Sequence, residues 1–392
     1  MKILHCVESY APSVGGMQEV VKQLSERLVK LGHGVTVATS KHEDRNFTEL
    51  NGVTIKEFAV SGSWVRGIEG EKDAYESFLL DNDFDVITFF AAQQWATDIA
   101  LPILTKIKAK KVSVPTGYSG FYWPEYKEYF EKMKTWIHQY DMNVYLSNDY
   151  RDINFAKKNN VTKTIIIPNG AAADEFENCD SKYLRKKYNI PQDNFLILHV
   201  GSYTGIKGHK EALKIFLKSN IKNATLLFIG NKYQYFYRHL IKNFPLGLRF
   251  LLSKLGSKQV IINHISRKDT VAAYKEADLF LFPSNIECSP IVLFECMAAK
   301  TPFLTTNVGN SKEIIEWSNA GKLLPTTFDS EGYSHATCNE STKMLEEMYN
   351  DHTTRNQLAE NGYKAWKEKF SWEIITQQYE KLYLSLISET KV

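Results

Sequence analysis

The sequence predicts two consecutive α/β domains, each built on a doubly wound, Rossmann-like parallel sheet and together facing a cleft. Short apolar runs alternate with amphipathic helical segments from the first residues, which is the pattern of a parallel sheet with crossover helices. The same pattern starts again near residue 195, after a polar stretch. A length of 392 residues is also more than one hydrophobic core usually supports.

The first domain opens with a strand, a glycine loop and a helix. Lys2–Val7 is predicted as a buried strand, and Gly15-Gly16 ends the loop that follows it. The next segment ends at Gly32 and carries apolar residues at helical spacing on one face: Val21, Leu24, Leu28 and Leu31. Further strands are predicted at Val35–Thr39, Val86–Phe90, Lys111–Val114, Asn143–Ser147 and Thr164–Ile167.

The second domain is predicted to begin with the strand Phe195–Val200, followed by a loop rich in Gly and Lys and a helix at about His209–Lys218. Further strands are predicted at Ala224–Ile229, Gln259–Asn263, Asp278–Phe282 and Pro302–Thr305. We therefore expect a first domain at residues 1–170, a polar linker at 171–194, a second domain at 195–371 and a C-terminal helix at 372–392.

Composition and charge narrow the class of protein. The net charge of +3 gives no support for nucleic-acid binding, and 43% hydrophobic with 24% charged residues is ordinary for a soluble globular protein. The five cysteines have no metal-ligand spacing, which favours reduced thiols over a disulfide framework. No secretory signal and no run of about 18 apolar residues is apparent. We expect a cytoplasmic protein, either free or held on a membrane surface.

The most informative stretch connects the strand Asp278–Phe282 to the helix that follows it. Ser289 is a favourable N-cap, and Pro290 suits the first helical position because its missing N–H would have no helical acceptor there. The first turn then offers free backbone N–H groups, those of Ile291 and Val292 among them. Such a helix N-terminus is a natural seat for phosphate.

Two glutamates flank this expected anion-binding site. Glu287 lies in the loop, and Glu295 is about five residues into the helix, which is roughly 8 Å along the axis. Carboxylates accept hydrogen bonds from hydroxyl groups, so the arrangement suits a sugar–diphosphate–ribose ligand. Either glutamate alone could be an ordinary solvent-exposed residue. The spacing, the cap and the strand-to-helix switch together favour the functional interpretation.

The pattern Glu-x7-Glu after a Phe-Pro-Ser strand end resembles the donor-site motif of the retaining GT-B glycosyltransferases of family 4, also called glycosyl transferases group 1. Other stretches match that family in the same order: Gly15-Gly16, Ile167-Pro168-Asn169-Gly170, Val200-Gly201 through Lys207-Gly208, Val308-Gly309-Asn310 before Glu313, and Phe370-Ser371-Trp372. The resemblance covers nearly the whole chain.

This resemblance implies an enzyme that moves a sugar from a nucleotide-sugar of UDP or GDP type to a glycan or lipid-linked acceptor, in polysaccharide or glycoconjugate biosynthesis. It implies that the first domain binds the acceptor and the second binds the nucleotide-sugar. It also implies that Glu287 contacts the donor sugar, that Glu295 contacts the ribose, and that the C-terminal helix packs back on the first domain. No cofactor is implied. We also expect no metal requirement, because no Asp-x-Asp pair follows a predicted strand. Retaining transfer needs no protein base if the leaving phosphate oxygen accepts the acceptor's proton.

Without a metal ion, the charge on the leaving diphosphate must be met by cations and backbone amides. Lys207 is the candidate cation, since it follows the strand Phe195–Val200 and parallel sheets bind ligands at the carboxyl ends of their strands. An exposed loop lysine is the alternative. The family pattern has an arginine where this chain has Ser202, and a serine cannot make the two-pronged contact of a guanidinium. Either Lys210 or Arg267 replaces that arginine, or the leaving group is stabilised less.

Residues of the first domain supply the other candidates. Gly15 and Gly16 have no side chain and tolerate positive φ, so the first loop's backbone could approach a ligand closely. Family members often have a histidine where this chain has Pro-Thr-Gly-Tyr after Val114. Thr116 and Tyr118 are candidate sugar contacts there, with ordinary turn residues as the alternative. An aromatic cluster follows, which is either an acceptor-binding lip or packed core: Tyr118, Phe121, Tyr122, Trp123 and Tyr126.

The segment 232–258 interleaves cations with aromatic and aliphatic residues. Such a basic amphipathic surface suits an anionic membrane. A solvated helix face is nearly as well supported, and nucleic acid is a minor alternative that we do not include among the expected partners.

Two other functions are open at this point. The chain could be a sugar-nucleotide epimerase or hydrolase of GT-B shape, or a catalytically silent sugar-nucleotide-binding partner, since Ser202 and the missing histidine both weaken the site. A dehydrogenase is disfavoured, because the first loop lacks Gly-x-Gly-x-x-Gly and no clear acidic residue for a ribose ends the second strand.

Overall fold

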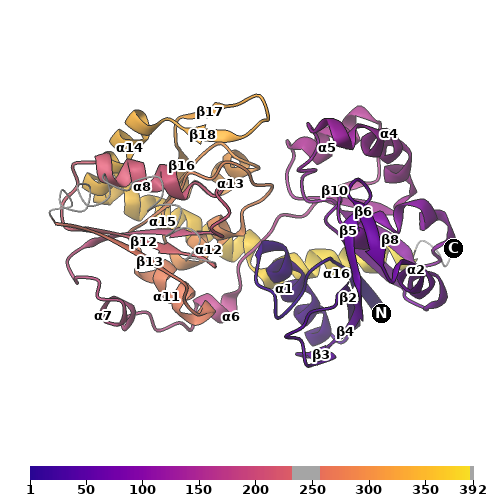
Figure 1. Cartoon of the computed structure of the whole chain (residues 1–392). Coiled ribbons are helices and arrows are strands. Elements are labelled where there is room, and N and C mark those ends of the chain that lie inside the picture. Colours follow the sequence, from indigo (N-terminus) through magenta and orange to yellow (C-terminus); the bar gives the residue numbers. More distant parts are fainter. Residues whose placement is uncertain (232–256, 389–392) are drawn as a thin grey trace. The chain divides into compact units, whose positions relative to one another are not determined.

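The computed structural model describes residues 1–231 and 257–388. Contacts divide the chain into two compact units. The first unit comprises Met1–Asn169 and the C-terminal segment from Trp372, and the second comprises Gly170–Ser371 (Figure 1). By these contacts, the segment 171–194 that was expected to be a linker belongs to the second unit.

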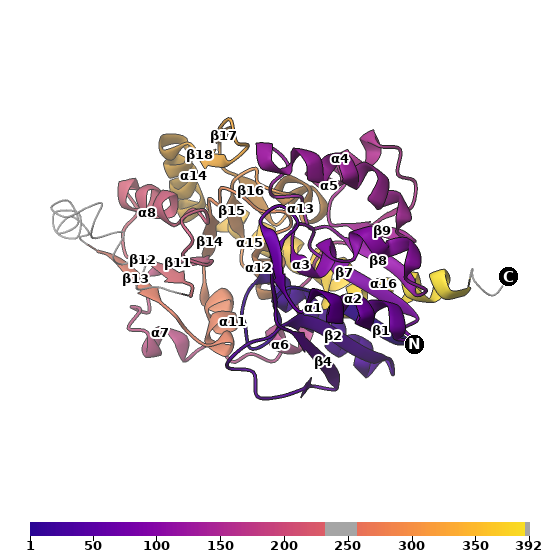
Figure 2. The ribbon, with the colours of Figure 1, turned by 45° about the vertical axis from the view of Figure 1, so that its right-hand side comes forward.

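The first unit contains an eight-stranded sheet in the order β10-β9-β8-β7-β1-β2-β4-β3, and Figure 2 shows β9, β8, β7 and β1 next to one another. Neighbouring strands are parallel except for β3 with β4. The strands are β1 (Lys2–Cys6), β2 (Gly34–Ser40), β3 (Glu49–Leu50), β4 (Val53–Phe58), β7 (Val86–Phe90), β8 (Lys110–Val114), β9 (Met142–Tyr145) and β10 (Thr164–Ile166). A separate antiparallel hairpin is formed by β5 (Val60–Ser63) and β6 (Gly67–Gly70).

Apolar sequence explains the centre of this unit. All five residues of β7 are buried, as expected for a parallel strand with both faces covered. Helix α1 buries the face that carries Val20, Val21, Leu24 and Leu28. The α-helices of the unit are α1 (Gly16–Lys30), α2 (Lys72–Asp81), α3 (Trp95–Asp98), α4 (Lys127–Trp136), α5 (Arg151–Lys158) and α16 (Trp372–Ser388). Short 3-10 turns lie at Leu101–Lys106, Pro124–Tyr126 and Ile137–Gln139.

Helix α16 comes last in the sequence but packs in the first unit. Arg27 of α1 binds Glu373 of α16 with 2.8 Å between Nη2 and Oε1. The hydroxyl groups of Tyr383 and Thr88 lie 2.7 Å apart, and both residues are buried. The C-terminal helix therefore contributes both to the surface and to the core of the first unit.

The second unit contains a six-stranded parallel sheet in the order β13-β12-β11-β14-β15-β16. Its strands are β11 (Phe195–Val200), β12 (Ala224–Ile229), β13 (Lys258–Asn263), β14 (Leu279–Phe282), β15 (Phe303–Thr305) and β16 (Gly321–Leu323). An antiparallel hairpin follows, made of β17 (Thr326–Phe328) and β18 (Ser334–Ala336). The helices are α6 (Ala173–Phe176), α7 (Leu184–Lys187), α8 (His209–Lys218), α11 (Arg267–Glu276), α12 (Ile291–Ala299), α13 (Ser311–Ser318), α14 (Cys338–Asn350) and α15 (His352–Ala365), with a π-helical turn at Trp366–Phe370.

The predicted fold class is confirmed, since both units are α/β with a largely or wholly parallel sheet. The predicted strands agree with the observed ones to within a residue or two at each end. Strand β4 was not predicted, although the alternation of buried Val53 and Ile55 with exposed Thr54 and Lys56 was an available signal of a half-buried strand. The hairpins β5–β6 and β17–β18 were also missed.

Candidate functional site

The strand order of the second sheet reverses between β11 and β14, which are hydrogen-bonded neighbours. In open parallel sheets, ligands bind beside the carboxyl ends of the strands at such a switch point. The loop 201–208 follows β11, and the loop 283–290 follows β14. These two loops contain the predicted residues Lys207 and Glu287.

Lys207 and Glu287 form an ion pair, with 2.6 Å between Nζ and Oε1. Ser284 Oγ donates a hydrogen bond to the same carboxylate oxygen over 2.9 Å, and Lys207 Nζ also donates to the carbonyl of Ile286 over 3.4 Å. The two charged side chains are only 26% and 13% exposed. The structure therefore brings the two predicted catalytic residues together, with a cation and a carboxylate side by side at the switch point.

Gly208 allows these two loops to meet. Its φ is 73°, and a Cβ at this position would lie 2.0 Å from the carbonyl oxygen of Pro283. The backbone N–H of Asn285 also donates to the carbonyl of Ile206 over 3.0 Å. The 201–208 loop is thus held directly against the 283–290 loop.

A buried histidine adjoins the 201–208 loop. His199 lies near the end of β11, and its Nδ1 is 2.8 Å from the carbonyl oxygen of Leu281. Burial lowers the pKa of His199 to about 4, against the opposite effect of hydrogen bonds to the backbone of Leu281 and Lys207. The ring is therefore neutral near pH 7, and its centre lies 4.4 Å from that of His209. Sequence reasoning missed His199, although a histidine inside an apolar strand was an available signal.

The second predicted glutamate has an arginine partner. Glu295 is 4% exposed, and its Oε1 lies 2.5 Å from Nη1 of Arg267. Arg267 Nη2 lies 2.5 Å from Oε2 of Glu175 on α6, so one guanidinium bridges two carboxylates. Burial raises the pKa of the Tyr274 hydroxyl, and the charge of Glu295 raises it further. Arg267, one of two suggested replacements for the missing arginine, is thus held against the predicted ribose contact. Glu175 was missed because it falls in the expected linker.

Ser202 lies half-buried in the 201–208 loop. Its carbonyl accepts a hydrogen bond from the backbone N–H of Thr204 over 2.7 Å, which shapes the turn before Lys207. The serine side chain stands where the family pattern has an arginine, so the structure offers no guanidinium from this position.

Helix α12 begins at Ile291, one residue later than predicted, and this corrects the assigned cap. Pro290 is the N-cap because its ψ of 109° is extended, and its carbonyl accepts from the N–H of Leu293 over 3.1 Å. Ser289 therefore precedes the cap and is buried. Ile291 and Val292 remain in the first turn of the helix, where backbone N–H groups have no acceptor within the helix.

Residues 14–175 match the family described as Glycosyltransferase Family 4, and residues 180–365 match the one described as Glycosyl transferases group 1. The chain belongs to the family 4 glycosyltransferases. The two matches run in sequence through both units, and the second one contains Lys207, Glu287 and Glu295.

Curated relatives of this glycosyltransferase are moderately similar to it. The capsular polysaccharide biosynthesis glycosyltransferase CapM of Staphylococcus aureus is 27% identical over 241 residues, which are 61% of this chain and 59% of that protein. The lipopolysaccharide glucosyltransferase WaaG of Escherichia coli K12 is 25% identical over 350 residues, covering 84% of this chain and 87% of WaaG. The uncharacterized glycosyltransferase MJ1607 of Methanocaldococcus jannaschii is 25% identical over 98% of both chains.

Solved structures share the fold of this glycosyltransferase. Sucrose-phosphate synthase from Thermosynechococcus elongatus matches with a TM-score of 0.78 at 18% identity and covers 99% of both chains. HepE of Anabaena in complex with UDP and glucose matches with a TM-score of 0.74 at 15% identity, over 98% of this chain and 100% of HepE. A structure of WaaG gives 0.71 at 18% identity, over 96% and 98%. The fold is therefore GT-B.

In the first unit of the glycosyltransferase, Gly15 and Gly16 lie at the start of α1. Gly15 is the N-cap in extended conformation (φ −179°), and Gly16 is the first helical residue. We expected that these glycines would be needed for a positive φ, and this expectation is wrong for both, because neither has a positive φ. A Cβ on Gly15 would meet only the flexible side chain of Gln18, at 2.4 Å, and one on Gly16 would meet nothing within 4 Å. The other expectation, free approach to the backbone, stays a prediction.

Arg45 holds the loop that leads to these glycines, and no sequence pattern pointed to this residue. The residue is buried, and its guanidinium donates to three backbone carbonyls: those of Ala11 at 2.6 Å, Ser40 at 2.9 Å and Tyr10 at 3.2 Å. It also pairs with Glu57. Tyr10 and Ala11 lie in that loop, whereas Ser40 ends β2 and Glu57 lies in β4, so Arg45 anchors the loop to two neighbouring strands.

The two other first-unit candidates differ in exposure. Thr116 is half-buried, whereas Tyr118 is 2% exposed and packs edge-on against Phe130 and Phe155, with ring centres 5.1 and 5.6 Å apart. The side chain of Tyr118 is therefore a core residue in the described structure. Most of the aromatic cluster is core as well, and Tyr122 is its one exposed ring, at 58%.

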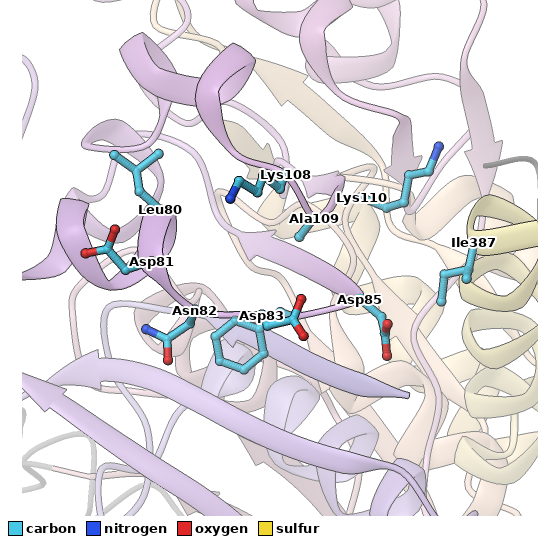
Figure 3. A pocket seen from close by; sticks show the side chains of 10 residues that line it. Leu80, Asp81, Asn82, Asp83, Asp85, Lys108, Ala109, Lys110 and Ile387 are labelled. Carbon is cyan, nitrogen blue, oxygen red and sulfur yellow. The ribbon is translucent and has the colours of Figure 1, made fainter. Parts of the chain in front are cut away.

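A pocket of about 380 Å³ lies in the first unit, beside the amino-terminal ends of strands β7 and β8 (Figure 3). It is lined by Asp83 and Asp85, which precede β7, by Lys108 before β8 and Lys110 at its start, and by Ile387 of α16. This is the amino-terminal edge of the strands, opposite to the edge where parallel sheets bind ligands. None of the predicted site residues is among those that line this pocket, and we assign it no part in the transfer.

Most of the predicted basic surface, residues 232–256, lies outside the described residues. Lys258 at its end belongs to β13, where Nζ donates to the carbonyl of Phe216 over 2.7 Å and burial lowers the pKa. Within residues 1–231 and 257–388, no helix is long and apolar enough to cross a membrane. The same residues contain no group of three or more His, Cys, Asp or Glu side chains suited to a metal ion.

Proposed function

We propose that this glycosyltransferase moves a sugar, with retention of anomeric configuration, from a nucleotide-sugar of UDP or GDP type to a glycan or lipid-linked acceptor in polysaccharide or glycoconjugate biosynthesis. The observation that carries the proposal is the Lys207–Glu287 ion pair at the switch point of the second sheet. The names of CapM and WaaG support the biosynthetic role, and the HepE structures with UDP and UDP-glucose support the donor class.

In this proposal the diphosphate binds to Lys207 and to the N–H groups of Ile291 and Val292, because a cation and a helix N-terminus both attract anions. An ammonium group has three donors, so Lys207 can contact phosphate oxygens while keeping its bond to Glu287. Glu287 then accepts hydrogen bonds from hydroxyl groups of the donor sugar.

The transfer itself breaks the bond between the anomeric carbon and the phosphate oxygen, and the electron pair stays on the diphosphate. The acceptor hydroxyl forms its new bond on the same face of the sugar, and its proton passes to the leaving phosphate oxygen. Lys207 stabilises the charge that develops on that oxygen. No protein base and no metal ion takes part in this scheme.

Glu295 accepts hydrogen bonds from the ribose hydroxyls in the proposed complex. Arg267 pairs with its carboxylate and keeps it in place, and Glu175 in turn holds Arg267. Because this contact exists before and during the reaction, its loss should appear as weaker nucleotide binding.

The donor site is tested with a thermal-shift panel of UDP-, GDP- and ADP-sugars. A ligand at about 100 times its Kd stabilises the fold by about 2.7 kcal/mol. We expect a shift with UDP- or GDP-sugars that is reduced in Glu295→Gln, whereas Glu287→Gln mainly lowers turnover. Glu360→Gln, which breaks an exposed ion pair with Lys300, is the matched control. No shift with any donor, or wild-type kinetics in both site variants, would contradict the assignment.

The stereochemical outcome is tested by proton NMR of the glycoside formed. Product with the donor's anomeric configuration supports retention, and the opposite anomer overturns it. Release of free sugar alone, or of an epimer, would favour the alternative enzymes. Loss of activity in EDTA that manganese restores would contradict a metal-free mechanism.

We also propose a cytoplasmic enzyme that binds the inner face of a membrane through residues 232–258, a proposal supported by their sequence alone. Each cation near an anionic surface contributes about 1 kcal/mol, so several together hold a protein there. Neutralising Arg238, Lys242, Arg249 and Lys254 should release the enzyme from anionic liposomes and leave activity on a short soluble acceptor intact. Failure of the wild type to bind such liposomes at low salt would show a solvated face instead.

A further inference from the structure

Backbone strain in the first unit is concentrated in two loops. Ten residues other than glycine have positive φ in the described part of the chain. Five are asparagines, which tolerate this conformation, and one is Lys300, the residue that ends α12. The remaining four are Ala91, Gln93, Thr116 and Tyr118, with φ of 61°, 65°, 58° and 49°. No helix end and no asparagine explains these four.

The four strained residues lie at the carboxyl ends of neighbouring strands. Ala91 and Gln93 follow β7, and Thr116 and Tyr118 follow β8. Strand β7 also pairs with β1, and the strand order of the first sheet reverses between these two. Parallel sheets bind ligands at this edge, and backbone strain that persists in a folded protein clusters at functional sites.

Hydrogen bonds hold the two loops in the strained conformation. Ala91 N donates to the carbonyl of Val114 over 2.9 Å, and Gln93 Oε1 accepts from the N–H of Gly120 over 3.2 Å. The amide Nε2 of Gln93 and the amide Oε1 of Gln94 are buried, and neither has a hydrogen-bond partner within the described residues. Strain and unpaired polar atoms at one place indicate a conformation kept for function rather than for stability.

Three groups meet at the surface here, and we call them the ring platform: Ser119 and Tyr122 of the loop after β8, and Arg151 at the start of α5. Tyr122 is 58% exposed, and the guanidinium carbon of Arg151 lies 4.8 Å from the centre of its ring. Arg151 Nη1 donates to the carbonyl of Ser119 over 3.2 Å, which ties the three residues together. An aromatic face packs against the apolar face of a sugar ring, and a guanidinium binds carboxylate or phosphate with paired N–H groups.

We infer that the ring platform binds a sugar ring that carries a carboxylate or phosphate group, and, resting on the proposed function, that this ring belongs to the acceptor. Tyr122 packs against the ring, Arg151 binds its anionic group, and the hydroxyl of Ser119 contacts a sugar hydroxyl. Gln93 is a positioning residue, because its Oε1 accepts from both Ser119 Oγ, at 3.4 Å, and the N–H of Gly120.

The test is saturation-transfer-difference NMR on the full chain with three probes: methyl β-D-glucuronide, glucose 6-phosphate and methyl β-D-glucoside. We expect both anionic probes, or one of them, to bind about fivefold or more tightly than the neutral glucoside, since a guanidinium–anion contact of this kind is worth roughly that ratio. Arg151→Gln should abolish the preference, and Tyr122→Ala should weaken all three probes. Lys132→Gln, which removes another cation held 4.8 Å from a ring in the same unit, should change nothing.

The tighter of the two anionic probes identifies the group on the acceptor. Equal binding of all three probes, no binding of any, or an unchanged preference in Arg151→Gln would overturn the inference. The nucleotide-sugar thermal shift on the same preparations reports on the second unit. A normal shift without probe binding therefore rejects the ring platform alone, whereas a missing shift rejects the proposed function.

Discussion

Lys207 is the one cation of the 201–208 loop, and it already has a carboxylate partner. In the proposed reaction the same ammonium group meets the diphosphate, at a position where Ser202 supplies no second charge. The site therefore depends on a single side chain for most of its leaving-group stabilisation from this loop.

Lys207→Ala should lower turnover by about 10²-fold or more, because one preorganised group facing a developing oxyanion is commonly worth that much. Steady-state kinetics with saturating donor would measure it. Lys300→Ala, a surface lysine of the same unit paired with Glu360, is the control. A loss of less than about tenfold would mean that Arg267 or another cation meets the diphosphate instead.

Asp152 should make the stability of the first unit depend on pH. Burial raises the pKa of its carboxyl group from 3.8 to about 6, and the N–H of Gly117 donates to it over 2.8 Å. The folded state thus binds the proton more tightly than the unfolded state does. The resulting stability is fully present below pH 3.8 and is lost as the pH rises through 6.

Relative to Asp152→Asn, the wild type should gain about 1 kcal/mol in free energy of unfolding between roughly pH 7 and pH 5. Urea unfolding of both proteins at the two pH values gives the difference. Burial also raises the pKa of Asp98 to about 6, but Asp98 is present in both proteins, so its contribution to the pH dependence cancels in the comparison. Parallel pH profiles would show that Asp152 is not protonated in this range.

At the scale of elements, the backbone strain in the two loops lowers the stability of the fold, and a substitution at a strained position can relieve part of it. Thr116 is β-branched, and its φ of 58° lies in the region that costs such residues about 1–2 kcal/mol. Thr116→Asn should therefore raise the free energy of unfolding by about 1 kcal/mol, since asparagine tolerates this region. Denaturant unfolding against Thr162→Asn, an exposed loop position without positive φ, measures the gain. Destabilisation by Thr116→Asn would mean that the threonine side chain makes contacts worth more than the strain.

Elements with a strong local signal were predictable from the sequence. Strands β7 and β11 are apolar runs interrupted by one polar residue each, Thr88 and His199, and their bounds were placed correctly. The start of α12 shifted by one residue, because whether Pro290 caps the helix or begins it depends on its ψ. The side chain of Tyr118 went into the core, because aromatic residues in a row fit a binding lip and a packed interior equally well.

Several residues of the candidate site could be named from the sequence, but the ion pairs that they form could not. Lys207 and Glu287 came from loops recognised in the sequence, and the structure joins them. The bond between Arg267 and Glu175 links positions 92 residues apart, and no local pattern encodes such a contact. Gln93 was missed for the same reason, since its importance rests on a backbone angle and on Gly120 in another loop.

At the scale of the whole molecule, helix α16 ties the C-terminal end of the chain to the core of the first unit. Tyr383→Ala should cost about 3–5 kcal/mol of stability, as expected for a large buried side chain, and Tyr383→Phe about 1 kcal/mol for the lost bond to Thr88. Leu384→Ala on the same helix, half exposed, should have little effect. Thermal and denaturant unfolding of the three variants measures this. Equal effects at positions 383 and 384 would mean that α16 is only loosely attached.

The chain enters and leaves the second unit at one place. Ala171 N donates to the carbonyl of Phe370 over 3.0 Å, Trp366 Nε1 donates to the carbonyl of Ala171 over 3.0 Å, and Ala171 pairs with Ser371. Residues 170–371 therefore form a cassette whose two ends meet. In the proposed assignment this cassette holds the donor site. Exchanging it between relatives, through two cuts at one place in the fold, should then transfer the donor specificity and leave the acceptor recognition of the first unit unchanged.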